Sequence, residues 1–202
     1  MFTLYHAPQS RSTRLLALLH AMEVRDRIDL QVVGIRRDNG TGARDPRNPH
    51  PEGRVPLLDT GGTLLRESNA IILFLTDHFD SALGRPVGHA QRADYLFWLS
   101  YYGNVMEPVA LAGFGGVGET PALVSGFGMA ENVAATLGAA LADAPYLLGQ
   151  DYSAADALVV SMFHFAPFLT PDVAAVRDWV ARCADHPSLA AAAAEEAAMP
   201  MP

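Results

Sequence analysis

The sequence predicts an α/β domain followed by an all-helical domain, and three observations support this division. Strand-like and helix-like segments alternate through the first part of the chain, whereas no strand-like alternation follows residue 88. Residues 1–80 balance ten Arg against ten acidic residues, whereas residues 81–202 hold four Arg and twelve acidic residues. Residues 81–88 contain two Gly and a Pro, which is typical of a linker. We therefore expect domains over 1–80 and 89–202.

The first domain is predicted from the period of its apolar residues. The expected elements are a strand over 2–5, a helix from residue 11, a strand over 28–33, at most a short helix over 43–48, strands from residue 55 and over 63–65, and a helix over 67–79. A strand–helix–strand unit of this length crosses over in the right-handed sense, so its two strands should be parallel. This order is that of a thioredoxin-like domain.

The second domain is predicted to be helical throughout. The expected helices cover 89–112, 121–142, 154–168, 172–184 and 187–198. The run Ala190 to Ala194 favours a helix but offers little side chain to pack, so we expect a frayed end there. Ser153 and Asp156 fit a capping box at the start of a helix, which favours a structural role for Asp156.

The composition argues against several classes of partner. The net charge of −8 lies wholly in the second domain, and an acidic surface does not favour nucleic acid. A lone Cys183 forms no internal disulfide, which suits a reducing compartment. Residues 1–10 lack a signal peptide pattern, and no apolar run reaches about 18 residues. The seven His show no metal-ligand spacing. We expect a cytoplasmic protein with no metal and no membrane contact.

Two short segments carry the strongest functional signal. Val55-Pro56 opens an apolar run, and an X-Pro bond is the kind that adopts the cis form at low cost. A cis bond there turns the preceding backbone groups outward, where they could pair with an extended peptide. Ser68 begins an apolar helix, and its hydroxyl and the unpaired amides nearby favour a carboxylate. Together they predict a site for a peptide-like anion.

These segments resemble those of a known family. His50-Pro51-Glu52-Gly53-Arg54-Val55-Pro56-Leu57-Leu58 and Glu67-Ser68-Asn69-Ala70-Ile71 are similar to two motifs of the glutathione transferases, at the family's spacing. Pro145 to Gly149 and Trp98 to Pro108 also resemble the family, so the resemblance covers nearly the whole chain. It implies a thioredoxin-like domain before a helical one, glutathione as co-substrate, and a homodimer.

The resemblance also implies roles for particular residues. Glu67 and Ser68 would hold the γ-glutamyl end of glutathione, and Val55, before Pro56, would hold its cysteinyl backbone. Arg54 and His50 would lie near the glycine carboxylate. The plainer alternatives are a dipole partner at the helix start for Glu67, a solvated side chain for Arg54 and a loop residue for His50.

The chemistry of glutathione requires a group that stabilises its thiolate, because a free thiol of pKa about 8.5 is mostly protonated at neutral pH. A hydroxyl donor beside a helix start suits this task. The loop over 8–12 leads into the first helix, and we expect Ser10 to be the donor, with Ser12 second and Tyr5 third. Helix capping is the alternative role of both serines.

The second substrate is expected to be a small apolar electrophile bound between the domains. Tyr102, Met106 and Phe114 are the candidate pocket residues, and core packing is their alternative role. The predicted function is transfer of alkyl or aryl groups to glutathione, a detoxification reaction. A non-catalytic carrier of the same fold, and a glutathione-dependent isomerase or dehalogenase, stay open as alternatives.

Overall fold

The computed structural model describes residues 1–37 and 39–200, and the chain forms two compact units. The first unit comprises Met1–His78 and His186–Pro202, and the second comprises Phe79–Asp185. The last helix, which the sequence analysis placed with the helical domain, therefore packs with the N-terminal unit. Its residues recur in the site described below.

A four-stranded mixed sheet forms the centre of the first unit. Its strands are β1 (Phe2–His6), β2 (Ile28–Val32), β3 (Leu57–Asp59) and β4 (Leu64–Arg66), in the order β2-β1-β3-β4. β1 is parallel to β2 and antiparallel to β3, and β3 is antiparallel to β4. The predicted α/β order and the parallel first pair are confirmed.

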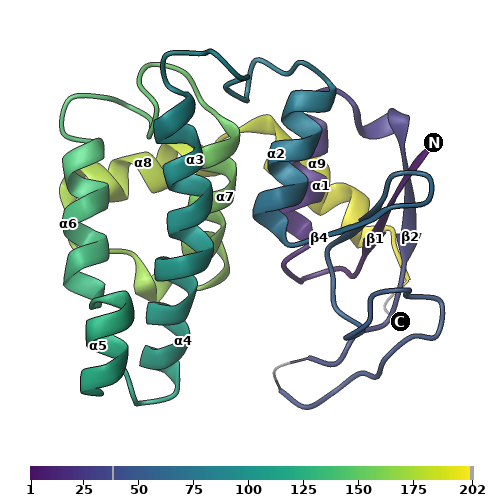
Figure 1. The fold of residues 1–202 in the computed structure, drawn as a ribbon, viewed down its shortest axis with the longest axis horizontal. Coiled ribbons are helices and arrows are strands. Elements are labelled where there is room, and N and C mark those ends of the chain that lie inside the picture. Colours follow the sequence, from purple (N-terminus) through teal and green to yellow (C-terminus); the bar gives the residue numbers. More distant parts are fainter. Residues whose placement is uncertain (38, 201–202) are drawn as a thin grey trace. The chain divides into compact units, whose positions relative to one another are not determined.

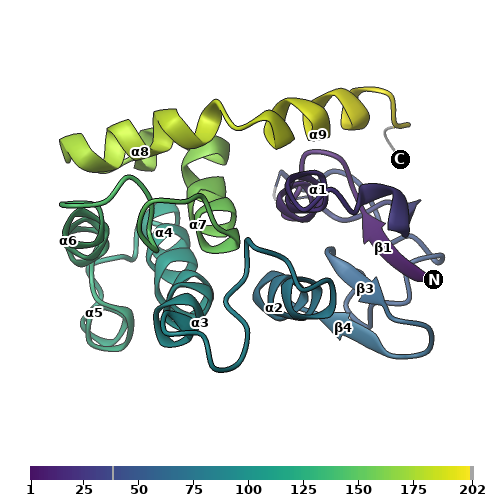
Figure 2. The same cartoon turned by 90° about the horizontal axis from the view of Figure 1, so that it is seen from above.

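Three helices belong to this unit: α1 (Thr13–Ala21), α2 (Ser68–His78) and α9 (Pro187–Ala197), beside a short 3₁₀ turn η1 (Arg25–Arg27). Figures 1 and 2 show α1 and α2 on one face of the sheet, with α9 beside α1. The apolar run of α1 is buried along its whole length from Leu15 to Leu19, which fixes the helix on the sheet.

One sequence expectation for the first unit is wrong and another is confirmed. Residues 43–48 form turns and irregular backbone, which agrees with the expectation of at most a short helix there. The alanine run does not fray, because Ala192 is 1 % exposed and packs against Leu16 and Ala17 of α1. Small side chains allow the two helix backbones to approach closely, so the absence of large side chains does not prevent packing here.

The second unit is helical, as predicted. Its elements are α3 (Arg92–Tyr101), η2 (Tyr102–Met106), α4 (Glu107–Phe114), α5 (Pro121–Phe127), α6 (Ala130–Ala140), α7 (Ala154–Phe165), η3 (Pro167–Leu169) and α8 (Ala174–Ala184). The long helix expected over 89–112 is helical from 92 to 114, with one π-helical turn at η2. The expectation of a single helix over 121–142 is wrong. Two helices, α5 and α6, form there, because Gly128 adopts a φ of +79° and ends α5.

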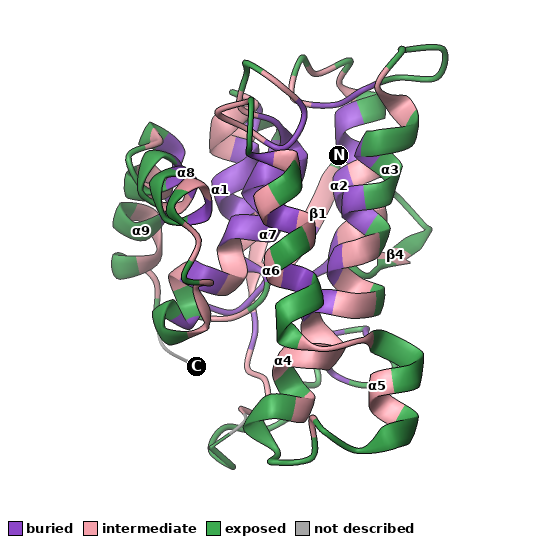
Figure 3. Ribbon diagram, turned by 90° about the vertical axis from the view of Figure 1, so that its left-hand side faces the viewer, coloured by how far each residue is buried: buried purple, intermediate pink, exposed green. Residues whose placement is uncertain are grey.

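The buried centre of this unit is organised around Asp156. Its carboxylate accepts hydrogen bonds from the Leu147 amide and from Trp179 Nε1, both at 2.9 Å, and from the Ser153 hydroxyl at 2.6 Å. The predicted capping box of Ser153 and Asp156 is therefore present. Burial raises the pKa of Asp156, against these hydrogen bonds, which lower it. Figure 3 shows α7 buried over most of its length, whereas α5 is mostly exposed.

No helix within residues 1–37 and 39–200 is both long and apolar enough to cross a membrane.

Candidate functional site

The strand register brings three segments of the first unit to one edge of the sheet. Leu57 pairs with Tyr5 of β1 on one side and with Arg66 of β4 on the other. The end of β1, the start of β3 and the end of β4 therefore lie next to one another. Packing of Ala7 against Val55 confirms this arrangement. The loop after β1, the Val55–Pro56 step and the start of α2 consequently share one surface.

The first of these features is the backbone at Val55. The Val55–Pro56 peptide bond is cis, as expected from the sequence. Within the described part of the chain, neither the amide nor the carbonyl of Val55 has a hydrogen-bond partner. Its side chain is 9 % exposed and packs with Ala7 and Val33. The side chain thus fixes the position of a main-chain donor and acceptor that an extended ligand could use.

The second feature is the start of α2. Glu67 adopts a φ of +69°, which a residue with a Cβ rarely does and which is often found at binding sites. Its side chain is exposed at the point where β4 turns into the helix. Ser68 is only 7 % exposed, and its hydroxyl finds no partner among the described residues. The amides of the first helical turn also lack helical partners, so this end favours an anion.

His50 and Arg54 differ sharply in their surroundings. His50 is 5 % exposed, and its Nδ1 accepts a hydrogen bond from the Glu52 amide at 3.0 Å. Burial lowers the pKa of His50, aided by nearby Arg charges and opposed by Glu52 and Glu67. Arg54, by contrast, is 75 % exposed and pairs with Glu52 at 3.0 Å. His50 thus organises the loop, whereas Arg54 extends into solvent.

Exposure separates one of the three candidate thiol-activating residues, Ser12, from the other two. Ser12 is completely buried, and its Oγ lies within 3.2 Å of His6 Nδ1, Ser10 Oγ and the backbone of Ala7. Ser10 is half-buried, with its Oγ 2.7 Å from the Ala7 carbonyl. Tyr5 is half-buried and packs against the cluster of Ala7 and its neighbours. Of the two serines, Ser10 is the one that retains exposed surface.

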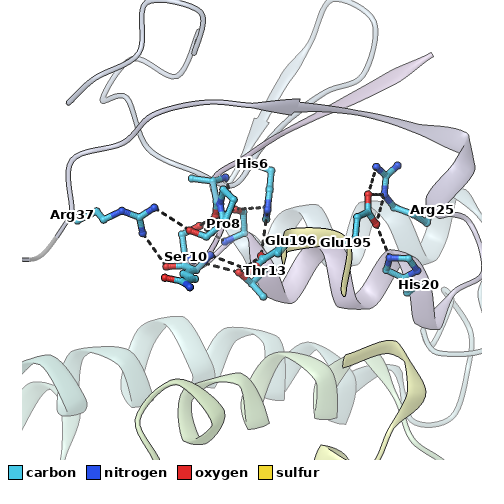
Figure 4. A network of polar contacts seen from close by, with 12 residues as sticks. His6, Pro8, Ser10, Thr13, His20, Arg25, Arg37, Glu195 and Glu196 are labelled. Atoms are coloured by element: carbon cyan, nitrogen blue, oxygen red, sulfur yellow. Dashed lines mark hydrogen bonds and ion pairs between the residues drawn. The ribbon is translucent and has the colours of Figure 1, made fainter. Parts of the chain in front are cut away.

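Two residues next to this loop, His6 and Glu196, were not predicted from the sequence (Figure 4). One oxygen of Glu196 accepts a hydrogen bond from Thr13 Oγ1 at 2.5 Å and lies 3.3 Å from His6 Nε2. The other accepts the Gln9 amide at 3.2 Å. Burial raises the pKa of Glu196, but these neighbours together bring it below its ordinary value. No motif marks Glu196, because its place depends on the packing of α9 against α1.

A further contact holds the loop from its other side. The guanidinium of Arg37 donates hydrogen bonds to the carbonyls of Pro8 and Gln9, at 3.1 and 3.2 Å. Gln9 itself has a φ of +55°. The loop backbone before Ser10 is therefore held by Arg37 and Glu196 in a conformation that a flexible loop would rarely adopt.

The candidate electrophile residues do not form one exposed surface in the second unit. Tyr102 and Met106 are 2 % and 1 % exposed, and the Tyr102 hydroxyl donates to Glu107 at 3.1 Å. Phe114 is half exposed, with its ring centroid 5.6 Å from that of Phe168. Only Phe114 of the three presents a large area to a ligand.

No group of three or more His, Cys, Asp or Glu side chains within the described ranges is arranged to hold a metal ion. The expectation of no metal stays a prediction.

Comparison with known proteins gave no matching family model and no matching curated protein. Solved structures do match. A glutathione S-transferase from Actinobacillus pleuropneumoniae has 22 % identity and a TM-score of 0.79, covering 97 % of this chain and 93 % of its own. A glutathione transferase from Methylococcus capsulatus has 25 % identity and a TM-score of 0.76, covering 98 % of this chain and 100 % of its own.

A sphingomonad glutathione S-transferase complexed with glutathione has 23 % identity and a TM-score of 0.74, again over 98 % of this chain and 100 % of its own. These matches extend over both units, and at this level of identity they establish the architecture. They agree with the resemblance in residues 50–71, which rests on different evidence. The chain therefore has the fold of the bacterial glutathione transferases.

Proposed function

We propose that this chain binds glutathione at the shared edge of β1, β3 and α2 and activates its thiol for attack on an apolar electrophile. The observation that carries the proposal is that the Val55 main chain and the Ser68 hydroxyl, neither of which has a partner among residues 1–37 and 39–200, lie at one edge of the sheet. The first group suits a peptide backbone, and the second suits a terminal carboxylate. Glutathione presents both.

Groups suited to both ends of the tripeptide lie near these main-chain groups. Ser68 and the first amides of α2 would bind the α-carboxylate of the γ-glutamyl residue, and the exposed Glu67 would bind its ammonium group. The exposed Arg54 would meet the glycine carboxylate. His50 would support this loop from within, since its ring is buried. Pro56 would fix the start of β3.

We assign the thiol-activating role to Ser10. A hydroxyl hydrogen directed at sulfur stabilises the thiolate, which is the nucleophilic form. Ser12 is buried and already surrounded by partners, so it is less suited to reach a ligand. The thiolate would form a bond to the electrophilic carbon as the leaving group departs with its electron pair. Phe114 would contribute to the electrophile's site, and the functional unit would be a homodimer.

Two measurements test this proposal. Calorimetry should detect saturable binding of glutathione to the wild-type chain. Ser10→Ala should lower turnover of a small haloarene by about 10²-fold, the usual effect of losing one preorganised donor. Ser125→Ala, an exposed serine on α5, serves as the control and should leave turnover unchanged.

The alternatives give different results. Glutathione binding with no turnover of any electrophile would fit a carrier. Release of halide without a stable glutathione conjugate would fit a dehalogenase, and rearrangement of the substrate would fit an isomerase. If Ser10→Ala is silent and Tyr5→Phe is not, Tyr5 is the donor.

A further inference from the structure

A continuous chain of polar groups lies behind the Ser10 hydroxyl. Ser10 Oγ is 2.7 Å from the Ala7 carbonyl oxygen and 2.8 Å from Ser12 Oγ, and Ser12 Oγ is 2.8 Å from His6 Nδ1. On the far side of the imidazole, His6 Nε2 faces Glu196 at 3.3 Å. His6 and Ser12 are fully buried, so the hydrogens between them come from the chain's own groups.

The direction of this chain follows from counting hydrogens. A hydroxyl carries one hydrogen, and a carbonyl carries none. Ser10 therefore donates its hydrogen to the Ala7 carbonyl at 2.7 Å, and Ser12 donates its hydrogen to Ser10 Oγ. The contact between Ser12 Oγ and His6 Nδ1 then needs a hydrogen on Nδ1. Only the longer contact of Ser12 with the Ala7 carbonyl, at 3.2 Å, is left without one.

The reverse direction fails at Ser10. If Ser10 donated to Ser12 and Ser12 donated to His6, two oxygens would lie 2.7 Å apart with no hydrogen between them. The backbone amides agree with the first direction. The Ala7 amide donates to Ser12 Oγ, and the Ser12 amide donates to Ser10 Oγ, each at 3.1 Å. Each hydroxyl oxygen then accepts two hydrogen bonds and donates one, which is its full capacity.

The other ring nitrogen, Nε2, is buried and forms no hydrogen bond with the described residues, although it lies 3.3 Å from an oxygen of Glu196. His6 Nε2 faces a Glu196 carboxylate whose pKa is below its ordinary value, so that carboxylate is ionised at neutral pH. A bare nitrogen lone pair would repel it. Among the described contacts, Glu196 is the charged group against the His6 ring, and Arg37 binds the carbonyls of Pro8 and Gln9 instead. A hydrogen on Nε2, unlike a lone pair, would be attracted to Glu196 and would make the ring an imidazolium.

We propose that the His6–Glu196 ion pair positions the Ser10 hydrogen for the glutathione sulfur. The cation directs the hydrogens of Ser12 and Ser10 one way, away from the ring, so Ser10 meets a bound thiolate as a donor. To donate to sulfur, Ser10 Oγ turns away from the Ala7 carbonyl together with its hydrogen, so the 2.7 Å contact is broken and no proton is transferred. This inference rests on the proposed function, since it needs the thiolate beside Ser10. His6, Ser12 and Glu196 are then positioning residues.

The first test needs no glutathione. Nitrogen chemical shifts of the His6 ring, assigned with a His6→Gln variant, should show both nitrogens protonated at neutral pH in the wild-type chain. Glu196→Gln removes the counter-charge and should give a neutral ring. A neutral ring in the wild-type chain overturns the proposal, whatever the protein binds.

The second test measures the fraction of bound glutathione present as thiolate, from its ultraviolet absorbance. Glu196→Gln should raise the pKa of the bound thiol by about one unit, a roughly tenfold loss of thiolate near neutral pH. Glu196→Asp, which keeps the charge, should restore most of it. Glutathione affinity should stay within about threefold, because the proposed contacts with the peptide do not include Glu196.

Glu195→Gln is the matched control, since Glu195 also fixes α9 but contacts Arg25 and His20 instead of His6. It should leave the thiol pKa unchanged. Equal effects of the two variants would mean that helix docking alone is responsible, which overturns the proposal. Absence of glutathione binding to the wild-type chain in calorimetry would overturn the proposed function itself. This outcome differs from a change in thiol pKa between variants, which tests only the role of the His6–Glu196 pair.

Discussion

Glu195 accepts two hydrogen bonds from the guanidinium of Arg25 at its Oε1, 2.6 Å from Nη2 and 2.9 Å from Nε, although the two residues are 170 positions apart. The second carboxylate oxygen lies 2.7 Å from His20 Nε2. Because Glu196 accepts a hydrogen bond from Thr13, two consecutive carboxylates fix the end of α9 against α1 and η1 (Figure 4). The C-terminal helix is therefore part of the architecture that holds the candidate site.

This arrangement predicts acid sensitivity. Burial raises the pKa of Glu195, but hydrogen bonds from Arg25 and His20 outweigh it and lower the pKa overall. Because the folded pKa lies below the unfolded value of about 4.3, the stabilisation is present above that pH and is lost as the pH falls through the folded pKa.

In urea titrations, the free energy of unfolding of the wild type should therefore fall more than that of Glu195→Gln between roughly pH 5 and pH 3. The difference should be about 1 kcal/mol, because the Arg25–Glu195 pair is partly exposed. Glu131→Gln, an exposed glutamate of α6, should follow wild type. Parallel pH curves for wild type and Glu195→Gln would refute the prediction.

Ala192 tests the packing of α9 on α1. Ala192→Leu adds three carbons where the side chain is 1 % exposed, and overpacking of this kind costs about 1–3 kcal/mol of unfolding free energy. Ala193→Leu, the exposed neighbour, should change it by less than about 0.5 kcal/mol. Thermal melts of both variants give the comparison, and equal melting temperatures would show that α9 is not packed as described.

The Asp156 network predicts a large loss in the second unit. Asp156→Ala leaves Trp179 Nε1 and the Leu147 amide without acceptors, which we expect to cost about 3 kcal/mol or more. Ser153→Ala removes a cap and should cost about 1 kcal/mol. Asp151→Ala, an exposed carboxylate, is the control. Unfolding followed by tryptophan fluorescence measures all three, and a mild Asp156→Ala would contradict this ranking.

Ser68 predicts the strength of the glutathione contact. Removing a hydrogen bond to a carboxylate costs roughly 1.5–3 kcal/mol, so Ser68→Ala should weaken glutathione binding by about 10-fold to 100-fold. Alanine favours a helix, so the fold should be kept. Calorimetry measures the affinity, with Ser81→Ala, outside this surface, as the control. Unchanged affinity in Ser68→Ala would remove this residue from the site.

Much of the fold was predictable because its signals are local. Apolar periodicity located α1 and α7, and the sequence around Val55 and Ser68 marked the strands and helix that the register brings together. The break at Gly128 was missed because a glycine inside a helical pattern is often tolerated, and only its φ of +79° reveals the end of α5.

The surroundings of Ser10 could not be predicted, because they depend on contacts between distant segments. His6 has no ligand-like spacing to any other residue, and Glu196 follows an alanine run that looked unpacked. Their meeting requires α9 to lie beside α1, which no local pattern specifies. The choice between Ser10 and Ser12 likewise depends on burial, which the spacing of two serines in one loop does not determine.

The most direct test of the account is a calorimetric titration of the wild-type chain with glutathione, followed by thiolate absorbance of the complex across pH. The account predicts saturable heat and a bound thiol that ionises below the value of about 8.5 for a free thiol. Absence of heat at millimolar glutathione, or a bound thiol that ionises no more readily than the free one, would contradict it.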